Sequence, residues 1–537
     1  NSAERRYQKT LSKNFTLYAD YKKNFNDRHD LSVMVGTSHE SENYDRFTAK
    51  RINFDQQENM SLQLGSAQDQ NAWSEGNQWT INSFFSRVNY TFANKYVIEG
   101  TIRADGSSRF DPDHRWGWFP GVNAAWRVGE EGFMKRLGWF EDLKVRASYG
   151  EMGNQSGIGL YDYIQLISLS NDYYPFGTGV KGQMATSGNI ISTSRTWETI
   201  QTTNVGFDFS TLNNRLYGSF DYFWKENKNM LIPKTYPSML GADAPSTNSG
   251  HLSIHGWEIS LGWRDQIKDF SYSVRFNISD AKNKVVDRVG SNLIKLGNNE
   301  TPTGYPLNSY FGYEFDGIIQ NEQELEAYKS RFSEGGIPGD LSVGDAMYKD
   351  LDGDGKLSVL GDGKEGSGDV KYLGDKNPRY NFGFNLSMAW KGFDLSAFIQ
   401  GVGRRTMFLE GESRCPMPEA WYQSAEYWYG KTWTPERTDA QYPAITLKDK
   451  RNYNYYVSTN TKFNVAYARL KNLQFGYTIP QTLTSKAGLQ KVRVYFSGED
   501  LFEVHNTPNG WDPEENSGSI TSYPFTRNYS FGINVVF

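Results

Sequence analysis

The sequence contains no long apolar run that could cross a membrane as a helix. A spanning helix needs roughly 20 consecutive apolar residues, whereas the apolar runs here are a few residues long, such as Ile533 to Phe537, which Asn534 interrupts. The mean hydropathy is -0.67, although 15% of the 537 residues are aromatic. A membrane β-barrel is compatible with both values, because its strands alternate lipid-facing apolar side chains with polar side chains that face the lumen.

Three other features are scarce, and each excludes a class of protein or site. Cys415 is the only cysteine, so the chain cannot form an intrachain disulfide or a cysteine-rich metal site. The 57 basic and 62 acidic residues form no basic arm or stripe, which argues against nucleic acid as a partner. Residues 1–10 show no cationic segment followed by an apolar one. We therefore expect that an export signal was removed or lies in missing upstream sequence.

Alternation of apolar and polar residues predicts strands of roughly ten residues, the length that crosses a bilayer in a barrel. Val205, Phe207 and Phe209 share one face, and the next strand follows Asn213 and Asn214, which tolerate the positive φ of a tight hairpin. The same pattern recurs at 216–224, 257–264, 382–390 and 393–399.

The connections between these strands alternate in length. Short turns are predicted near 23–28, 93–94, 213–214, 266–269 and 391–392. Long segments are predicted near 41–78, 151–201, 226–254, 281–379, 404–462 and 503–524. Short periplasmic turns and long extracellular loops are typical of a transmembrane, antiparallel, up-and-down β-barrel, so the fold class is all-β. The alternative, a soluble β-sandwich or β-solenoid, rarely has loops as long as 281–379.

No motif predicts catalysis. The sequence has no nucleophile elbow, phosphate loop or H-E-x-x-H, since Asn43 stands where His39–Glu40 would need the second histidine. The six histidines are scattered singly. We therefore predict that the chain is not an enzyme; a barrel hydrolase whose site assembles from distant strands is the enzymatic alternative.

Long motifs along the chain resemble the SusC/RagA family of TonB-dependent outer-membrane transporters of Bacteroidetes. The first group reads SRVNYTFANKYVIEGTIRADGSSRF from Ser86, GWFPGVNAAWRVGEEGFMK from Gly117 and LKVRASYGEMGNQSGIGLYDY from Leu143. The second reads AYARLKNLQFGYTIP from Ala466, VRVYFSGEDLF from Val492, GWDPEE from Gly510 and the terminal RNYSFGINVVF. One departure is Glu499–Asp500 before Leu501–Phe502, where the family usually has Gln–Asn.

The resemblance implies a 22-stranded barrel in the outer membrane of a Gram-negative, Bacteroidetes-like bacterium. Residues 1–537 would supply its C-terminal portion, about 15 strands, while the plug and the N-terminal strands come from upstream sequence or a separate chain. The function implied is TonB-dependent import of an oligosaccharide or oligopeptide, with the TonB complex acting through the plug and a SusD-like lipoprotein closing over the loops. The alternative is an adhesin or receptor barrel without active transport.

One loop sequence suggests a metal ion, although the transporter interpretation requires no cofactor. Asp350, Asp352 and Asp354 precede Gly355, as in the first half of a calcium loop. Position twelve is Gly361 instead of glutamate, so a calcium site would need a ligand from elsewhere. The candidate ligands are Asp350, Asp352, Asp354, Lys356, Ser358 and Asp362. The alternative is a hydrated acidic turn.

Aromatic residues in the long loops are the candidate substrate contacts, because rings beside polar groups stack on sugars and on peptide side chains. These residues are Tyr173, Tyr174, Trp421, Tyr422, Trp428 and Tyr455. The alternative role of such rings is to pack the loops together. We also expect 151–201, 281–379 and 404–462 to bury an interface with a partner protein.

Overall fold

The computed structural model divides into two compact units, each built from several stretches of the chain. One consists of Asn1–Arg127, Val145–Val205 and Lys225–Leu252, and the other of Val128–Lys144, Gly206–Trp224 and Ser253–Phe537. The structure describes all residues except 1, 56–57, 59, 69, 171–174, 177–179, 182–183, 189, 234–238, 240–245, 289–296, 301, 361–367, 419–422, 447–448, 516–517, 519–522 and 524.

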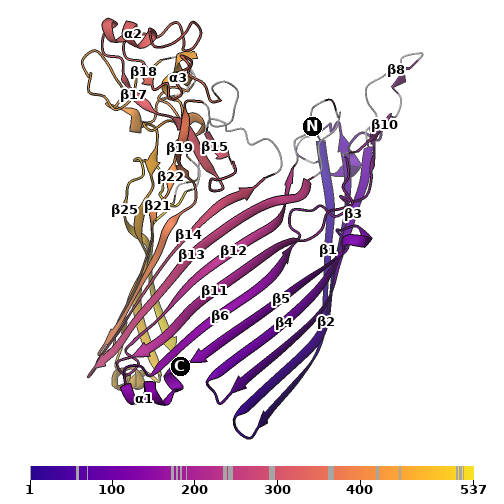
Figure 1. Cartoon of the computed structure of the whole chain (residues 1–537), viewed down its shortest axis with the longest axis vertical. Coiled ribbons are helices and arrows are strands. Elements are labelled where there is room, and N and C mark those ends of the chain that lie inside the picture. The colour runs from indigo at the N-terminus through magenta and orange to yellow at the C-terminus, as the bar shows by residue number, and fades with distance from the viewer. Residues whose placement is uncertain are drawn as a thin grey trace. The chain divides into compact units, whose positions relative to one another are not determined.

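One antiparallel sheet of 15 strands dominates the fold, and its strand order follows the chain (Figure 1). In that order the strands are β1 (Ser2–Phe25), β2 (His29–Ile52), β3 (Gln70–Phe92), β4 (Tyr96–Ser107), β5 (Trp116–Arg127), β6 (Asp142–Asn154), β11 (Glu198–Thr211), β12 (Leu216–Pro233), β13 (Ser246–Ile267), β14 (Phe270–Asp287), β20 (Arg379–Trp390), β21 (Phe393–Arg404), β24 (Tyr467–Thr478), β25 (Lys491–His505) and β26 (Asn528–Val536). The all-β prediction and the predicted number of strands are confirmed. β1 and β26 stand at the two ends of the order.

Shorter elements occupy the connections. The short strands are β7 (Ile167–Ser170), β8 (Pro175–Phe176), β9 (Val180–Lys181), β10 (Met184–Ser187), β15 (Gly297–Glu300), β16 (Ser309–Tyr313), β17 (Phe315–Ile318), β18 (Ala346–Tyr348), β19 (Val370–Asp375), β22 (Thr406–Met407) and β23 (Phe463–Asn464). The helices are α1 (Gly132–Leu137), α2 (Glu322–Lys329), α3 (Asp449–Asn454) and α4 (Gln481–Thr484). Within the described ranges, no helix has the length and apolar character needed to cross a membrane.

The predicted short turns are confirmed, and their residues show why they form. The β3–β4 turn places Ala93 and Asn94 at φ 51° and 56°, and the β11–β12 turn places Asn213 and Asn214 at φ 59°. The β20–β21 turn ends on Gly392 at φ 90°, a conformation that glycine adopts without strain. Each turn reverses the chain within a few residues, so consecutive strands pair directly.

The predicted extents of two long loops are wrong. The sequence suggested a loop over 41–78, but β2 continues to Ile52 and β3 begins at Gln70, with regular pairing from His29–Phe92 to Arg51–Gln70. The predicted loop over 226–254 is likewise shortened by β12 and β13. Bilayer thickness limits only the span within lipid. Backbone pairing can continue above the membrane. There most side chains are polar on both faces, so the alternation that marks a strand in the sequence is lost.

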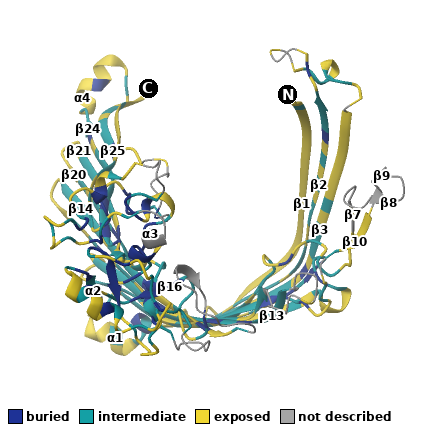
Figure 2. Cartoon of the chain, turned by 90° about the horizontal axis from the view of Figure 1, so that it is seen from above, coloured by how far each residue is buried: buried dark blue, intermediate teal, exposed yellow. Residues whose placement is uncertain are grey.

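The two faces of the sheet differ as the alternation predicts. Val205 and Phe207 are 40% and 39% exposed on the face assigned to lipid, whereas Asp208, on the reverse face, pairs with Lys144 at 2.8 Å. Figure 2 shows that β1 is exposed along its length.

Aromatic residues that follow one another on β5 lie on opposite faces of the sheet. Trp116 and Trp118 are exposed. Phe119 is instead buried against Trp197, at 5.6 Å between ring centroids. Neighbouring residues of a strand point to opposite faces, so Trp118 and Phe119 cannot share one.

The face assignment predicts how two adjacent positions on β13 respond to charge. Leu261→Arg should destabilise the barrel by about 2–4 kcal/mol, because an arginine on the lipid face must be desolvated. Ser260→Arg, on the lumen face, should change the free energy of unfolding by only about 0.5 kcal/mol. Urea unfolding of the full protein in lipid vesicles measures both. Equal losses would contradict the assignment.

Candidate functional site

The two longest connections of the sheet fold into a small domain of their own. We call this the loop domain; it comprises the described residues within 302–378 and 404–465. Figure 1 shows α2, β17, β18 and α3 gathered within it. The segment expected to be a long loop over 281–379 is therefore largely structured. Two clusters of buried aromatic and aliphatic side chains form the cores of the loop domain.

The first core joins the two connections through tyrosines. The hydroxyl groups of Tyr328 and Tyr453 lie 2.8 Å apart, and the backbone N–H of Tyr348 donates to the Tyr328 hydroxyl at 2.9 Å. The Tyr348 hydroxyl donates to the Tyr453 carbonyl at 2.9 Å. Burial raises the pKa of Tyr348 and of Tyr453 well above the ordinary value, so both phenols stay neutral. Their role here is to hold distant segments together.

The second core contains two of the predicted substrate residues. Trp428 and Tyr455 are 3% and 2% exposed, and their rings meet edge to face at 5.6 Å. The Tyr455 hydroxyl donates to the carbonyl of Pro443 at 3.0 Å. This burial favours the packing role that the sequence left open, so substrate contact by either ring remains a prediction. The other four candidates, Tyr173, Tyr174, Trp421 and Tyr422, lie outside the described residues.

Three carboxylates converge on the predicted calcium loop. Oxygen atoms of Asp350, Asp352 and Asp369 lie within 4.8 Å of one another. Burial and the neighbouring carboxylates raise the pKa of Asp369. Burial and the nearby carboxylates of Asp354 and Asp350 likewise raise the pKa of Asp352. A divalent cation would relieve this repulsion, and oxygen ligands suit calcium.

The other predicted ligands have different positions. The Asp354 carboxylate accepts a hydrogen bond from the Lys356 backbone N–H at 2.7 Å, and Asp354 is not part of the three-carboxylate group. The Ser358 backbone N–H donates to Asp369 at 2.7 Å. Asp362 lies outside the described part of the chain. Sequence reasoning missed Asp369, because it follows the twelve-residue template by eight positions and no spacing rule reaches it.

A buried charge network fastens the last long connection to β24 and β25. The Arg469 side chain is 2% exposed. Its Nη2 lies 2.5 Å from Asp512 Oδ2, and its Nη1 lies 3.1 Å from Glu514 Oε2. Lys471 bridges Glu514 at 3.0 Å and Asp500 at 2.7 Å. Sequence analysis recognised GWDPEE only as a motif. The structure shows that its acidic residues anchor the connection.

Comparison with known proteins identifies the family. Residues 1–501 match the model described as TonB dependent receptor-like, beta-barrel. The chain belongs to this family. The TonB-dependent receptor P3 of Formosa agariphila is 31% identical over 98% of the chain and 52% of its own length. The TonB-dependent receptor SusC of Bacteroides thetaiotaomicron is 26% identical over 99% of the chain and 50% of its own length.

A solved structure supports the same fold. The structure titled RagAB peptide transporter superposes with a TM-score of 0.81 at 24% identity, over 99% of the chain and 56% of the matched chain. Together with SusC, it supports a SusC/RagA-type outer-membrane barrel. The chain spans about half the length of the curated relatives it matches.

The network around Arg469 predicts a local effect in this receptor barrel. Arg469→Met should lower the local stability of residues 506–515 by about 3 kcal/mol, because it leaves partly buried carboxylates without their cation. Limited proteolysis and hydrogen exchange of those residues measure the change. Arg527→Met is the control: its side chain is 51% exposed and pairs with Glu503, so an effect below about 1 kcal/mol is expected. Equal effects would contradict this ranking.

Proposed function

We propose that this chain is the C-terminal barrel portion of a TonB-dependent importer for an oligomeric nutrient. The observation that carries the proposal is similarity to SusC along 99% of a chain that forms a 15-stranded antiparallel sheet. The cargo would be an oligosaccharide or oligopeptide. The fold neighbour titled a peptide transporter favours neither, because the identity of 24% supports the fold alone.

Completion of the barrel requires further strands in this proposal. β1 enters a short turn and β26 follows a long connection, so both run toward the same end of the sheet. Direct pairing of β1 with β26 would be parallel, whereas a closed antiparallel barrel needs an odd number of strands between them. Seven strands give 22. We propose that upstream sequence or a separate chain supplies these strands together with a plug through which TonB acts.

A SusD-like lipoprotein is the proposed partner on the loop side. The β7–β10 hairpin and the residues preceding it present Ile167 and Leu169, which are 70% and 66% exposed, with Leu166 at 57%. Exposed apolar side chains grouped on one hairpin are typical of protein interaction surfaces. The hairpin lies within 151–201, where we expect a partner interface.

Energy dependence distinguishes the importer from the adhesin or receptor alternative. Cells that carry the full protein should accumulate the native cargo, identified by mass spectrometry of the purified complex. A protonophore or loss of TonB should abolish accumulation while leaving surface binding intact. The adhesin alternative predicts binding with no accumulation under any condition. Accumulation that is unchanged without TonB would contradict energy coupling.

We also propose that the acidic loop binds calcium through Asp350, Asp352 and Asp369. The converging carboxylates and the raised pKa values of Asp352 and Asp369 support the proposal. Asp350 also accepts hydrogen bonds from the backbone N–H groups of Gly353 and Gly355, at 2.7 and 3.0 Å, which shapes the loop around the carboxylates. In this arrangement Asp369 supplies the ligand that the truncated sequence motif lacks.

Calcium titration of the chelator-treated full protein tests this site. Asp352→Asn and Asp369→Asn should each weaken binding by about tenfold or more. Asp354→Asn, the matched control outside the three-carboxylate group, should weaken it less. Because the folded pKa values of Asp352 and Asp369 are raised, the calcium-free fold should lose stability as pH rises through them, and calcium should restore that stability. If isothermal titration calorimetry of the full protein detects no heat of calcium binding, the site is refuted.

A further inference from the structure

Two arginines flank one tyrosine ring on neighbouring strands of the sheet. The Arg264 guanidinium carbon on β13 lies 5.3 Å from the Tyr217 ring centroid on β12, and that of Arg275 on β14 lies 5.9 Å from it. Arg275 Nη2 also donates to the Tyr217 hydroxyl at 3.4 Å. A Cβ added at Gly262 would lie 2.3 Å from Tyr217 Cζ, so the absence of a side chain at Gly262 makes room for the ring. We call Tyr217, Arg264 and Arg275 the arginine clamp.

The clamp faces the lumen. Residues that alternate with it form the apolar face of the same strands. The ring centroids of Phe220 and of Phe207, on neighbouring β11, lie 5.8 Å apart. The Trp263 indole N–H donates to the Tyr272 hydroxyl at 3.1 Å. Because successive side chains of a strand point to opposite faces, the clamp lies on the reverse side from these rings. The lumen wall therefore carries two closely spaced positive charges at this place.

Neither arginine of the clamp has a carboxylate partner among the residues that the structure describes. Arg264 Nε donates to the carbonyl of Asn214 at 3.1 Å, and the ring supplies only a cation–π contact to each guanidinium. Some other arginines of the sheet have carboxylate partners: Arg493 pairs with Asp394, and Arg379 with Asp280. Both arginines of the clamp are solvent-exposed, so their donors are available.

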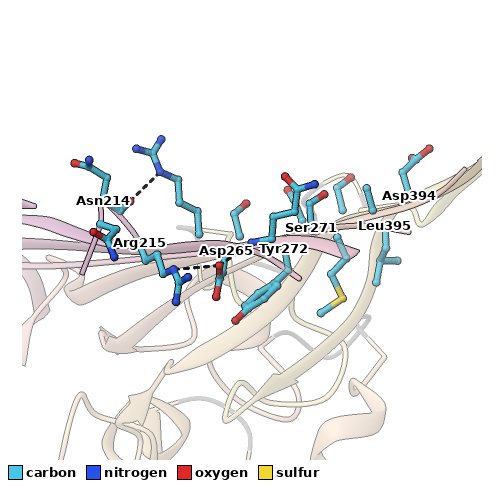
Figure 3. A pocket seen from close by; sticks show the side chains of 15 residues that line it. Asn214, Arg215, Asp265, Ser271, Tyr272, Asp394 and Leu395 are labelled. Atoms are coloured by element: carbon cyan, nitrogen blue, oxygen red, sulfur yellow. Dashed lines mark hydrogen bonds and ion pairs between the residues drawn. The ribbon is translucent and has the colours of Figure 1, made fainter. Parts of the chain in front are cut away.

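A polar groove of about 710 Å³ begins beside the clamp. Arg264, Asn214, Gln266, Ser271 and Ser273 contribute hydrogen-bonding groups to it. Figure 3 shows Asn214 and Asp394 on one side of the sheet and Arg215, paired with Asp265 at 3.2 Å, on the other. Asp394 also lines the groove and is paired with Arg493, and Arg275 lies outside the lining, so Arg264 is the cation of the groove that has no carboxylate partner among the described residues. Guanidinium groups bind carboxylates by paired hydrogen bonds, which makes a carboxylate the ligand that fits.

We propose that the arginine clamp holds an acidic side chain of the plug inside the barrel. This inference rests on the proposed function, in which a plug occupies the lumen. A domain covering Arg264 and Arg275 would remove both charges from water, and a buried charge without a partner is costly. A plug carboxylate placed between the guanidinium groups compensates that cost and fastens the plug to this wall.

A photo-crosslinker at Ser273 tests the inference in the full protein in outer membranes. Ser273→p-benzoylphenylalanine leaves the clamp intact and lies beside Arg275 on the same face. We expect crosslinks to a plug peptide that contains Asp or Glu. In the Arg264→Gln, Arg275→Gln double variant, the yield should fall by about tenfold or more, the effect of lost charge-assisted hydrogen bonds. Arg215→Gln, which removes a cation from the other side of the sheet, should leave the yield unchanged.

The outcomes separate this inference from the proposed function. Resistance to heat on semi-native gels establishes that the variants are folded. A plug that is present but crosslinks elsewhere, or with the same yield in the double variant, overturns the clamp and leaves the importer intact. Crosslinks to added acidic cargo alone also overturn it, since they assign the clamp to cargo. Absence of any plug in the full protein refutes the proposed architecture itself.

Discussion

No water is available inside a bilayer to satisfy peptide groups, and this constraint shapes the whole chain. Each unpaired backbone N–H or C=O costs several kcal/mol in lipid, so strands must pair continuously with their neighbours. The regular register from β2 to β5 shows how the sequence meets this demand, with short turns that return each strand beside the last. The same constraint makes β1 and β26 significant, because the ends of a sheet expose unpaired groups.

Strand pairing in turn creates two surfaces with different chemistry. Alternation places rings such as Phe207 and Phe220 on one side, while charged pairs such as Lys144 with Asp208 lie on the other. A polar lumen wall can bind groups that a lipid face cannot. The arginine clamp is a local feature of that wall, and its chemistry depends on a register that brings β12, β13 and β14 together.

The loop domain is stabilised differently from the sheet, because it lies outside the membrane and needs a core of its own. Its tyrosines bury both ring and hydroxyl, and the hydrogen bonds among Tyr328, Tyr348 and Tyr453 satisfy groups that burial would otherwise leave unpaired. The charge network of Arg469 achieves a similar result for the last connection with ion pairs in place of rings.

Local sequence patterns determined the strands, the tight turns and the family, because alternation and turn residues act over a few positions. Asn213–Asn214 and Lys391–Gly392 needed no tertiary information to be recognised as turns. Tertiary structure decided what depends on distant segments. It buried Trp428 and Tyr455 in a core, extended β2 and β3 beyond membrane thickness, and brought Asp369 to Asp350 and Asp352. It also placed Arg264 and Arg275 around Tyr217, since register across three strands, rather than spacing along one, sets which side chains meet.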